Sequence, residues 1–359
     1  MQTRTHHVAV LAGDGIGPEV MAEALKVMDA AAKKFGFTVT RDERLVGGAA
    51  IDACGRPLPD ETVEACDRAD AILFGSVGGP KWDALPHESR PEVGALLPLR
   101  KRYELFCNLR PARFYEGLEG LSPLRRDIAE NGFDMVCVRE LTGGIYFGRP
   151  KGREGEGEAE RAFDTETYTR AEVRRIAKLA FEIARHRRGR VTSVDKANVL
   201  ETSRFWREIA QQLAPQYPEV ELDFMFVDNA AMQIIRQPTH FDVIVTENMF
   251  GDILTDEASV ISGSLGMLPS ASVGSEVALF EPIHGSYPQA AGKNIANPMA
   301  AILSAAMLLE HLGLTAEGSA VRDAVNRALT EGIVTEDLAA QGERRYSTSE
   351  VGDFIAAHI

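Results

Sequence analysis

Short apolar runs alternate with amphipathic helical patterns along most of the chain, and this alternation limits the possible folds. Val8–Ala12 has the character of a buried strand. Pro18–Phe35 places apolar residues on one side at helical spacing, until Gly36 ends the pattern. Strands that alternate with helices predict an α/β fold with a largely parallel sheet. Further strands are expected at Ala71–Gly75, Met135–Val138, Val191–Val194, Leu222–Val227 and Asp242–Thr246.

Three further segments carry helical signals. Thr169 and Glu172 have the spacing of a capping box, which predicts a helix that runs to about His186. Met299–Leu309 is nearly all apolar and is too short to span a bilayer, so a buried helix is expected there. The stretch from Leu338 onward reads as a polar helix.

Length and charge narrow the class of protein. A chain of 359 residues is typical of two domains. It carries 39 Lys and Arg against 53 Asp and Glu, a net charge of −14. This balance argues against a nucleic acid or an anionic membrane as partner, because either would require a basic face. A small anionic substrate stays possible if basic residues gather locally.

The four cysteines and the N-terminus suggest a compartment. No cysteine pair has C-x-x-C spacing, so neither a zinc knuckle nor a redox motif is predicted. The apolar stretch near the N-terminus is too short for a signal-peptide core. Buried free thiols in a reducing cytoplasm are therefore expected.

Polar residues follow most of the expected strands. Ligands of α/β proteins gather beyond the carboxyl ends of strands, so these residues together predict a polar cleft of the kind that enzymes have. They are Asp14 with its flanking glycines, Arg139–Glu140, Asp195–Lys196, Asp228–Asn229 and Glu247–Asn248.

Known nucleotide and hydrolase motifs fit the chain poorly. The opening GDGIGPE matches G-x-G-x-x-G at Gly13 and Gly15, but Pro18 replaces the last glycine. This predicts a turn from strand to helix with free amides, and is weak support for a Rossmann fold. The chain has no phosphate-binding G-x-x-x-x-G-K-[ST], no G-x-S-x-G and no H-E-x-x-H.

The most specific pair of acidic residues lies in FGDILTDE. Asp252 and Asp256 are four residues apart, so a helix places both carboxylates on one face. Like charges at this spacing destabilise a helix by about 0.2–0.5 kcal/mol, and a divalent cation reverses that effect. Oxygen ligands favour Mg²⁺ or Mn²⁺ over zinc. A solvated acidic face is the alternative.

Three arginines from separate segments form a second candidate group. Arg100 lies on an expected helix, Arg110 in an extended segment and Arg139 at the end of a buried strand. A buried guanidinium needs a carboxylate, and Glu140 could supply it. Alternatively, the three arginines converge to bind a dicarboxylate by bidentate pairing. Tyr146 and Lys196 are candidates for proton transfer, although either could serve packing or solvation.

Several motifs together resemble one enzyme family. GDGIGPE, RELTGGIYFG, DKANVLETS, FGDILTDE and GKNIANP look like the β-decarboxylating dehydrogenases that act on isocitrate and isopropylmalate, over essentially the whole chain. The resemblance implies a two-domain α/β fold that is not a Rossmann fold. The first domain would comprise 1–105 and 263–359 with most of the NAD site. The second would comprise 106–262, with the dimer contacts, an arm around Lys151–Arg161 and the metal aspartates.

The resemblance also assigns roles to individual residues. Arg100, Arg110 and Arg139 would bind the substrate carboxylates, and Leu96 and Leu97 would face its isopropyl group. Asp252 and Asp256 would bind Mg²⁺ or Mn²⁺ with Asp228 from a second subunit, next to the substrate. Tyr146 and the partner's Lys196 would be acid and base, so a homodimer with shared sites is implied. The residues implied for NAD binding are His284, Gly285, Ser286, Gln289 and Asn297.

The implied reaction is the NAD-dependent oxidative decarboxylation of isopropylmalate to 4-methyl-2-oxopentanoate in leucine biosynthesis. RELTGGIYFG favours this substrate over isocitrate. Tartrate, D-malate, homoisocitrate and isocitrate remain alternatives, as does a binding module without activity. Gln289 stands where NAD-using relatives commonly carry aspartate, and it neither repels nor pairs with a phosphate. NAD is thus expected, with reduced discrimination against NADP. Tyr287 could stack on adenine.

Overall fold

The computed structural model describes residues 4–115, 117–118 and 120–359, which divide into two compact units. Unit 1 contains Met1–Leu105, Tyr115–Pro123 and Ser262–Ile359. Unit 2 contains Phe106–Phe114 and Leu124–Ile261. The domain boundaries expected from the sequence did not include the return of the chain to unit 1 at Tyr115–Pro123. Both units alternate strands with helices, so the α/β prediction is confirmed.

Unit 1 is built on strands in the order β2-β1-β3-β12-β11. Neighbouring strands run parallel except β11, which is antiparallel to β12. The strands are β1 (Thr5–Gly13), β2 (Thr38–Glu43), β3 (Ala71–Ser76), β11 (Pro269–Val273) and β12 (Ala278–Pro282). The alternation in the sequence did not reveal β11 and β12, because no helix separates them.

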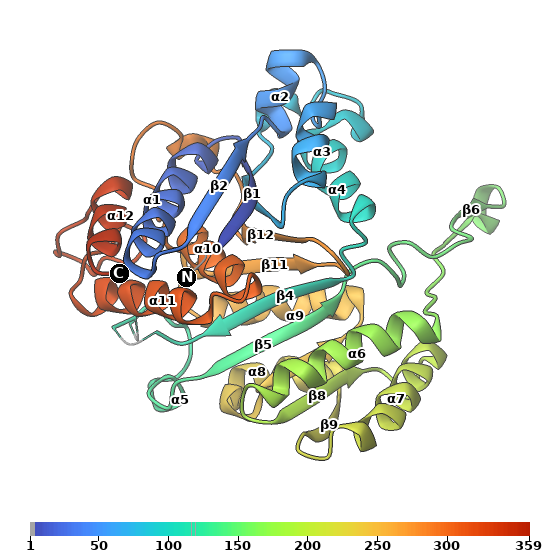
Figure 1. Ribbon diagram of the computed structural model, residues 1–359. Coiled ribbons are helices and arrows are strands. Elements are labelled where there is room, and N and C mark those ends of the chain that lie inside the picture. The colour runs from blue at the N-terminus through green and yellow to red at the C-terminus, as the bar shows by residue number, and fades with distance from the viewer. Residues whose placement is uncertain (1–3, 116, 119) are drawn as a thin grey trace. The chain divides into compact units, whose positions relative to one another are not determined.

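Helices cover both faces of the unit 1 strands (Figure 1). One group is α1 (Gly17–Phe35), α10 (Met299–His311), α11 (Thr315–Thr330) and α12 (Thr348–Ala357), and the other is α2 (Gly47–Cys54), α3 (Asp60–Asp67) and α4 (Leu97–Arg102). The core on the second side includes Leu11, Phe74 and Leu99, all at most 1% exposed.

Two helix predictions in unit 1 are confirmed and one is wrong. α1 ends at Phe35, where Gly36 adopts φ +74° and donates its N–H to the Ala32 carbonyl. α10 is almost wholly buried, as its apolar sequence predicts. The expected polar helix from Leu338 begins only at Thr348, because Ser347 and Glu350 form a capping box that starts α12 there.

Unit 2 has strands in the order β4-β5-β10-β8-β9, parallel except for β4, which is antiparallel to β5. The strands are β4 (Cys107–Arg113), β5 (Asp134–Glu140), β8 (Arg190–Asp195), β9 (Glu221–Phe226) and β10 (Val243–Thr246). The helices are α5 (Arg126–Ala129), α6 (Arg170–Arg185), α7 (Glu201–Leu213), α8 (Val227–Arg236) and α9 (Asn248–Ile261). Helices α6 and α7 lie on one face of the strands, and α8 and α9 lie on the other (Figure 1).

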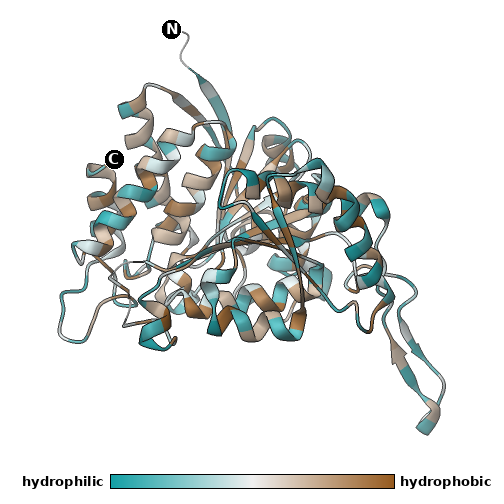
Figure 2. Cartoon of the chain, turned by 90° about the horizontal axis from the view of Figure 1, so that it is seen from below, coloured by the Kyte–Doolittle hydropathy of each residue, from teal (hydrophilic) through white to brown (hydrophobic). Residues whose placement is uncertain are grey.

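Amphipathic patterning explains how these helices pack. Thr169 and Glu172 form the predicted capping box at the start of α6, whose buried side includes Val173, Ile176 and Ala180. Figure 2 shows hydrophobic and hydrophilic residues on different sides of the helices. A short exposed hairpin, β6 (Gly152–Glu154) with β7 (Arg161–Phe163), extends from unit 2 at the position of the expected arm (Figure 1).

Two observations concern membranes and thiols. Within the described ranges, no helix is both long enough and apolar enough to cross a bilayer. All four cysteines are free, and three of them are buried, whereas Cys54 is exposed.

Candidate active site

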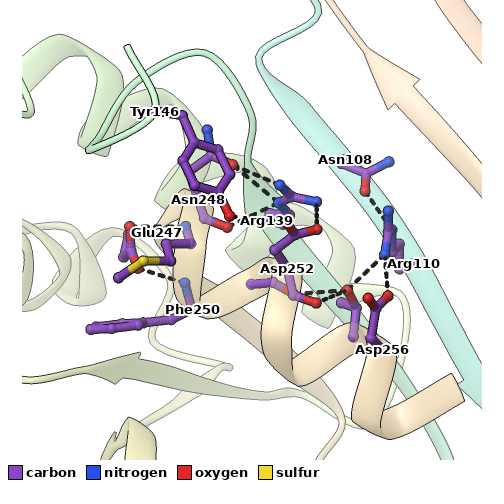
Figure 3. Close-up of polar contacts among 12 residues, drawn as sticks. Asn108, Arg110, Arg139, Tyr146, Glu247, Asn248, Phe250, Asp252 and Asp256 are labelled. Carbon is purple, nitrogen blue, oxygen red and sulfur yellow. Dashed lines mark hydrogen bonds and ion pairs between the residues drawn. The ribbon is translucent and has the colours of Figure 1, made fainter. Parts of the chain in front are cut away.

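Helix α9 presents the two aspartates of the sequence motif. It begins directly after β10, and Asp252 and Asp256 lie about one turn apart on it, as the spacing predicts. The Asp252 side chain is 36% exposed and the Asp256 side chain is 71% exposed, so both carboxylates reach solvent. Each is nevertheless paired with an arginine of unit 2 (Figure 3).

Arg139, at the end of β5, is the buried member of this cluster. Its Nη1 donates to Asp252 Oδ1 at 2.5 Å, and its Nη2 donates to the side-chain oxygen of Asn248 at 2.8 Å. Its Nε donates to the backbone carbonyl of Asn248 at 3.0 Å. The expectation that Glu140 could be the partner is wrong: adjacent strand residues point to opposite faces, and Glu140 accepts hydrogen bonds from the Thr142 and Gly143 backbones.

Arg110 approaches the same helix from β4. Its Nη1 donates to Asp256 Oδ1 and to the Thr255 hydroxyl, both at 3.0 Å, and its Nε donates to Asn108 Oδ1 at 2.7 Å. Because β4 and β5 are antiparallel neighbours, the two arginines from distant parts of the sequence meet one helix face. Figure 3 shows both guanidinium groups directed toward the α9 aspartates.

Tyr146 completes the cluster from the loop after β5. Its hydroxyl donates to Asp252 Oδ2 at 3.0 Å. Partial burial and the adjacent Asp252 carboxylate raise the pKa of the Tyr146 phenol, since both disfavour phenolate. The phenol therefore keeps its proton at neutral pH and can act as a proton donor.

The donor set of α9 suits a hard divalent cation. Asp252 and Asp256 offer only carboxylate oxygens, which Mg²⁺ and Mn²⁺ prefer. In the part of the chain that the structure describes, however, no three His, Cys, Asp or Glu side chains are grouped closely enough to hold a metal.

Lys196 and Asp228 are paired with each other. Lys196 follows β8, Asp228 lies in the first turn of α8, and Lys196 Nζ contacts Asp228 Oδ1 at 2.5 Å. The bond from Lys196 lowers the pKa of the Asp228 carboxyl. The two residues are together as the resemblance implies, but one chain does not group Asp228 with Asp252 and Asp256.

Arg100, Leu96 and Leu97 lie on unit 1. A π-helical turn, Glu92–Leu96, runs into α4, and such turns are frequent at functional sites. Arg100 Nη2 donates to Glu281 Oε1 of β12 at 2.9 Å, while its buried Nε has no hydrogen-bond partner. Leu97 is exposed and Leu96 is only partly buried. One N–H of Arg100 is thus left for a further acceptor.

A cavity of unit 1, of about 610 Å³, is lined by several of the residues expected to bind NAD. His284, Gly285 and Asn297 line it together with Tyr287 and Asp337. His284 Nδ1 lies 3.0 Å from the Gly285 carbonyl, so it carries the ring proton, and Nε2 is left as an acceptor without a partner. Burial lowers the pKa of His284, which keeps the ring neutral.

Ser286 and Gln289 do not line this cavity. The Ser286 side chain is buried, and its backbone carbonyl accepts from the Ile16 N–H at 2.8 Å. This contact ties the GDGIGPE turn to the His284 loop, and a Cβ on Gly15 would lie 1.9 Å from that carbonyl oxygen. Gln289 is exposed. Asp337, which the sequence did not single out, accepts from Asn297 Nδ2 and Ser264 Oγ.

Two of the polar residues at strand ends have structural roles. The Asp14 carboxylate, 4% exposed, accepts from the backbone N–H groups of Gly48, Ala49 and Gly78. Asp195 pairs with Arg207 at 2.8 Å through both oxygens. Asn248 and Glu247, by contrast, support the Arg139 cluster, although the sequence marked them only as residues after a strand.

Comparisons with known proteins identify the family of the chain. The family described as isocitrate/isopropylmalate dehydrogenase matches residues 7–355. A 3-isopropylmalate dehydrogenase of Salmonella typhi is 60% identical over 359 residues, which cover 99% of each chain. The enzyme of that name from Escherichia coli K12 is 59% identical, with the same coverage.

Solved structures of this kind share the fold. An isocitrate dehydrogenase from Methylococcus capsulatus superposes with a TM-score of 0.84 at 35% identity, covering 98% of this chain and 99% of its own. A β-decarboxylating dehydrogenase from Thermococcus kodakarensis gives a TM-score of 0.80 at 37% identity, covering 98% of this chain and 96% of its own. The expected fold, which is not a Rossmann fold, is confirmed. The chain therefore belongs to the isocitrate/isopropylmalate dehydrogenase family.

Proposed function

We propose that the protein catalyses the oxidative decarboxylation of 3-isopropylmalate to 4-methyl-2-oxopentanoate, with NAD as oxidant and Mg²⁺ or Mn²⁺ as metal, in leucine biosynthesis. The observation that carries the proposal is the cluster on α9, where two arginines, two aspartates and Tyr146 meet. Curated relatives of that activity at about 60% identity support this substrate over tartrate, D-malate, homoisocitrate and isocitrate.

The arginines supply the binding chemistry for a diacid. Arg110 and Arg139 present guanidinium groups beside α9, and Arg100 keeps an unpartnered Nε–H on unit 1. Guanidinium groups pair with carboxylates in bidentate geometry, so a malate backbone suits them. Leu96 and Leu97 suit the isopropyl group, because a carboxylate buried against leucine side chains would be costly.

Two residues handle the protons. When bound, NAD would supply the hydride acceptor, and a cation held by Asp252, Asp256 and Asp228 of the partner subunit would supply a Lewis acid. Lys196 of the partner subunit takes the hydroxyl proton. When CO₂ leaves, the electron pair stays on the substrate, and Tyr146 donates a proton to the carbon that lost the carboxylate. The place of the Tyr146 hydroxyl, which donates to Asp252 Oδ2 at 3.0 Å, supports this role.

In a homodimer, site residues that are not grouped within one chain would come together from two chains. Met232 and Ile235 of α8 and Ile253 and Val260 of α9 are between 45% and 60% exposed, although α8 and α9 pack side by side. A second copy of this surface would cover these apolar residues. It would also bring Asp228 and Lys196 of the partner subunit toward Asp252 and Asp256. The exposed β6–β7 hairpin is suited to contact the same partner.

The cavity of unit 1 is the proposed site for the adenosine part of NAD. His284 Nε2 and Asp337 offer acceptors for hydroxyl and amino donors. Glu336 also lines the cavity, so two carboxylates disfavour the extra phosphate of NADP. Gly285 and Asn297 line the cavity, while Ser286 and Gln289 belong to the same segment without lining it.

The decisive experiment is NADH formation by the purified chain with 3-isopropylmalate, with and without Mg²⁺. Turnover that depends on the metal and exceeds that with D-malate, isocitrate or homoisocitrate is expected. Faster turnover of D-malate would refute the substrate assignment. Lys196→Ala should remove turnover while the variant stays folded, and unchanged NAD reduction would refute the assignment of the base.

Mixed dimers test whether sites are shared. Lys196→Ala and Asp252→Asn each remove activity if every site needs both residues. In a dimer with one copy of each variant, one site carries both substitutions and the other carries neither, so activity should return on mixing unfolded chains and refolding them. Failure to regain activity, with each homodimer folded, would contradict the shared site.

A further inference from the structure

Tyr168 joins two segments of the proposed active site. It lies between β7 and α6, and its ring packs edge-on against Trp206 with the centroids 5.4 Å apart. Its hydroxyl donates to Glu247 Oε2 at 3.1 Å and accepts from the Asn248 backbone N–H at 3.0 Å. Both hydrogen-bond positions of one phenol are therefore used at the start of α9.

The first turn of α9 depends on these partners. The Glu247 carboxylate also accepts from the backbone N–H groups of Phe250 at 2.6 Å and Met249 at 3.1 Å, so it caps the helix. Asn248 in turn holds Arg139 through its side-chain oxygen. The Tyr168 hydroxyl thus anchors the end of the helix from which Asp252 projects one turn later. Figure 3 shows Glu247 and Asn248 beside this cluster.

The loop that carries Tyr146 is held by the same segment. Gly144 donates its N–H to the Thr167 carbonyl at 3.1 Å, and Asn248 Nδ2 donates to the Gly143 carbonyl at 3.1 Å. A Cβ on Gly144 would lie 2.1 Å from the Tyr168 hydroxyl oxygen, and one on Gly148 would lie 1.8 Å from the Thr165 carbonyl. Only glycines permit this close approach on both sides of Tyr146.

We propose that Tyr168 is a positioning residue, whose hydroxyl holds the first turn of α9 and the Gly143–Gly148 loop in one register and so fixes the Tyr146 hydroxyl against Asp252. The role rests on the proposed function. Without the hydroxyl, the Asn248 N–H loses its acceptor and Glu247 Oε2 keeps only the Met249 N–H, both in a largely buried place, and the first turn moves to find new partners. Tyr146 then loses its alignment for proton donation.

The test is Tyr168→Phe in the full chain, which removes one oxygen and keeps the ring. We expect kcat with 3-isopropylmalate to fall about 10- to 100-fold, as misplacement of a catalytic group by about 1 Å does. KM should rise by less than kcat falls, because Arg139 is held by Asn248 of the first turn, whereas Arg110 is anchored by Asn108 and Thr255. Trp206 fluorescence reports whether the local packing is retained.

Tyr217→Phe is the matched control. Tyr217 is buried, whereas Tyr168 is partly buried, but like Tyr168 it packs on an aromatic ring and donates to a carboxylate, Glu182, at 2.9 Å, and it has no link to α9. It should keep kcat within about twofold, with a comparable loss of stability from the lost hydrogen bond. A merely structural role of Tyr168 predicts the same kinetics for both variants.

Each outcome decides between the hypotheses. If the unmodified chain turns over 3-isopropylmalate and Tyr168→Phe matches Tyr217→Phe, the positioning role is overturned and the proposed function stands. If the unmodified chain has no such activity, the proposed function fails and this role fails with it. Should Tyr168→Phe not fold, Glu247→Ala removes the acceptor of the Tyr168 hydroxyl from the other side, and an unchanged kcat in that variant overturns the role.

Discussion

Gly251 of α9 is a position where one added methyl group should disturb the proposed site. Its missing side chain makes room for Arg139: a Cβ there would lie 2.5 Å from Arg139 Cγ, 2.8 Å from its Cβ and 3.1 Å from its Cδ. Two of these distances are shorter than real contacts. Arg139 Cβ is fixed by the β5 backbone, so the arginine side chain must swing away from Asp252 and Asn248.

For Gly251→Ala, two effects on the free energy of unfolding oppose each other, whereas the effect on activity has one direction. Alanine in a helix interior gains about 1 kcal/mol over glycine, and overpacking costs about 1–3 kcal/mol, so the free energy of unfolding should fall by at most about 2 kcal/mol. Displacement of a binding guanidinium by about 1 Å should lower kcat/KM about 100-fold, equivalent to about 2.7 kcal/mol in the transition state.

The assay compares kcat/KM for 3-isopropylmalate with urea unfolding of the same variant. Gly120→Ala serves as the control, because a Cβ there meets nothing within 4 Å. A Gly251→Ala variant with wild-type kcat/KM would refute the argument that Arg139 must occupy this place. If the variant loses both folding and activity, the surroundings of Gly251 cannot adjust to an added side chain, and Gly251→Ser should then also fail to fold.

Three further predictions follow from buried groups and from the cofactor loop. Burial raises the pKa of Glu247 to about 7, so the folded chain binds this proton more tightly than the unfolded chain does. The free energy of unfolding should therefore fall as pH rises from 4.5 to about 7. Glu247→Gln should remove up to ~3 kcal/mol of this pH dependence, measured by urea unfolding at several pH values. Asp14→Ala should cost at least about 3 kcal/mol of unfolding free energy, because three backbone N–H groups lose their acceptor, and a loss below 1 kcal/mol in the same measurement would contradict this. Gln289→Asp should raise the ratio of kcat/KM for NAD over NADP, whereas an unchanged ratio would leave discrimination to Glu336 and Asp337.

Local sequence patterns predicted the elements of the site well. The spacing of Asp252 and Asp256 indicated one helix face, and the apolar run before Arg139 indicated a buried strand that delivers it. Such patterns depend only on periodicity along a few residues. Gly36 and the Thr169 capping box likewise marked helix ends through chemistry that is local to the chain.

Partners across the fold were harder to predict. The pairing of Arg139 with Asp252 joins residues 113 apart, and it follows from the packing of α9 on β5. Tyr168 gave no signal in the sequence, because its role depends on two hydrogen bonds to residues about 80 positions away. The pair Gly144 and Gly148, which flank Tyr146, was the only local hint that something approaches that loop closely.

The ion pairs on α9 have a consequence for how ligands enter. Arg110 with Asp256 and Arg139 with Asp252 are two positive and two negative charges that cancel before anything binds. A dianion that binds the two arginines alone leaves the two carboxylates without a counter-charge. A divalent cation that binds the two carboxylates alone leaves the arginines without one. When the dianion and the cation bind together, each charged side chain exchanges one partner for another and none is left unpaired. Affinity for each is thus linked to the presence of the other, and by reciprocity the enhancement is equal in both directions.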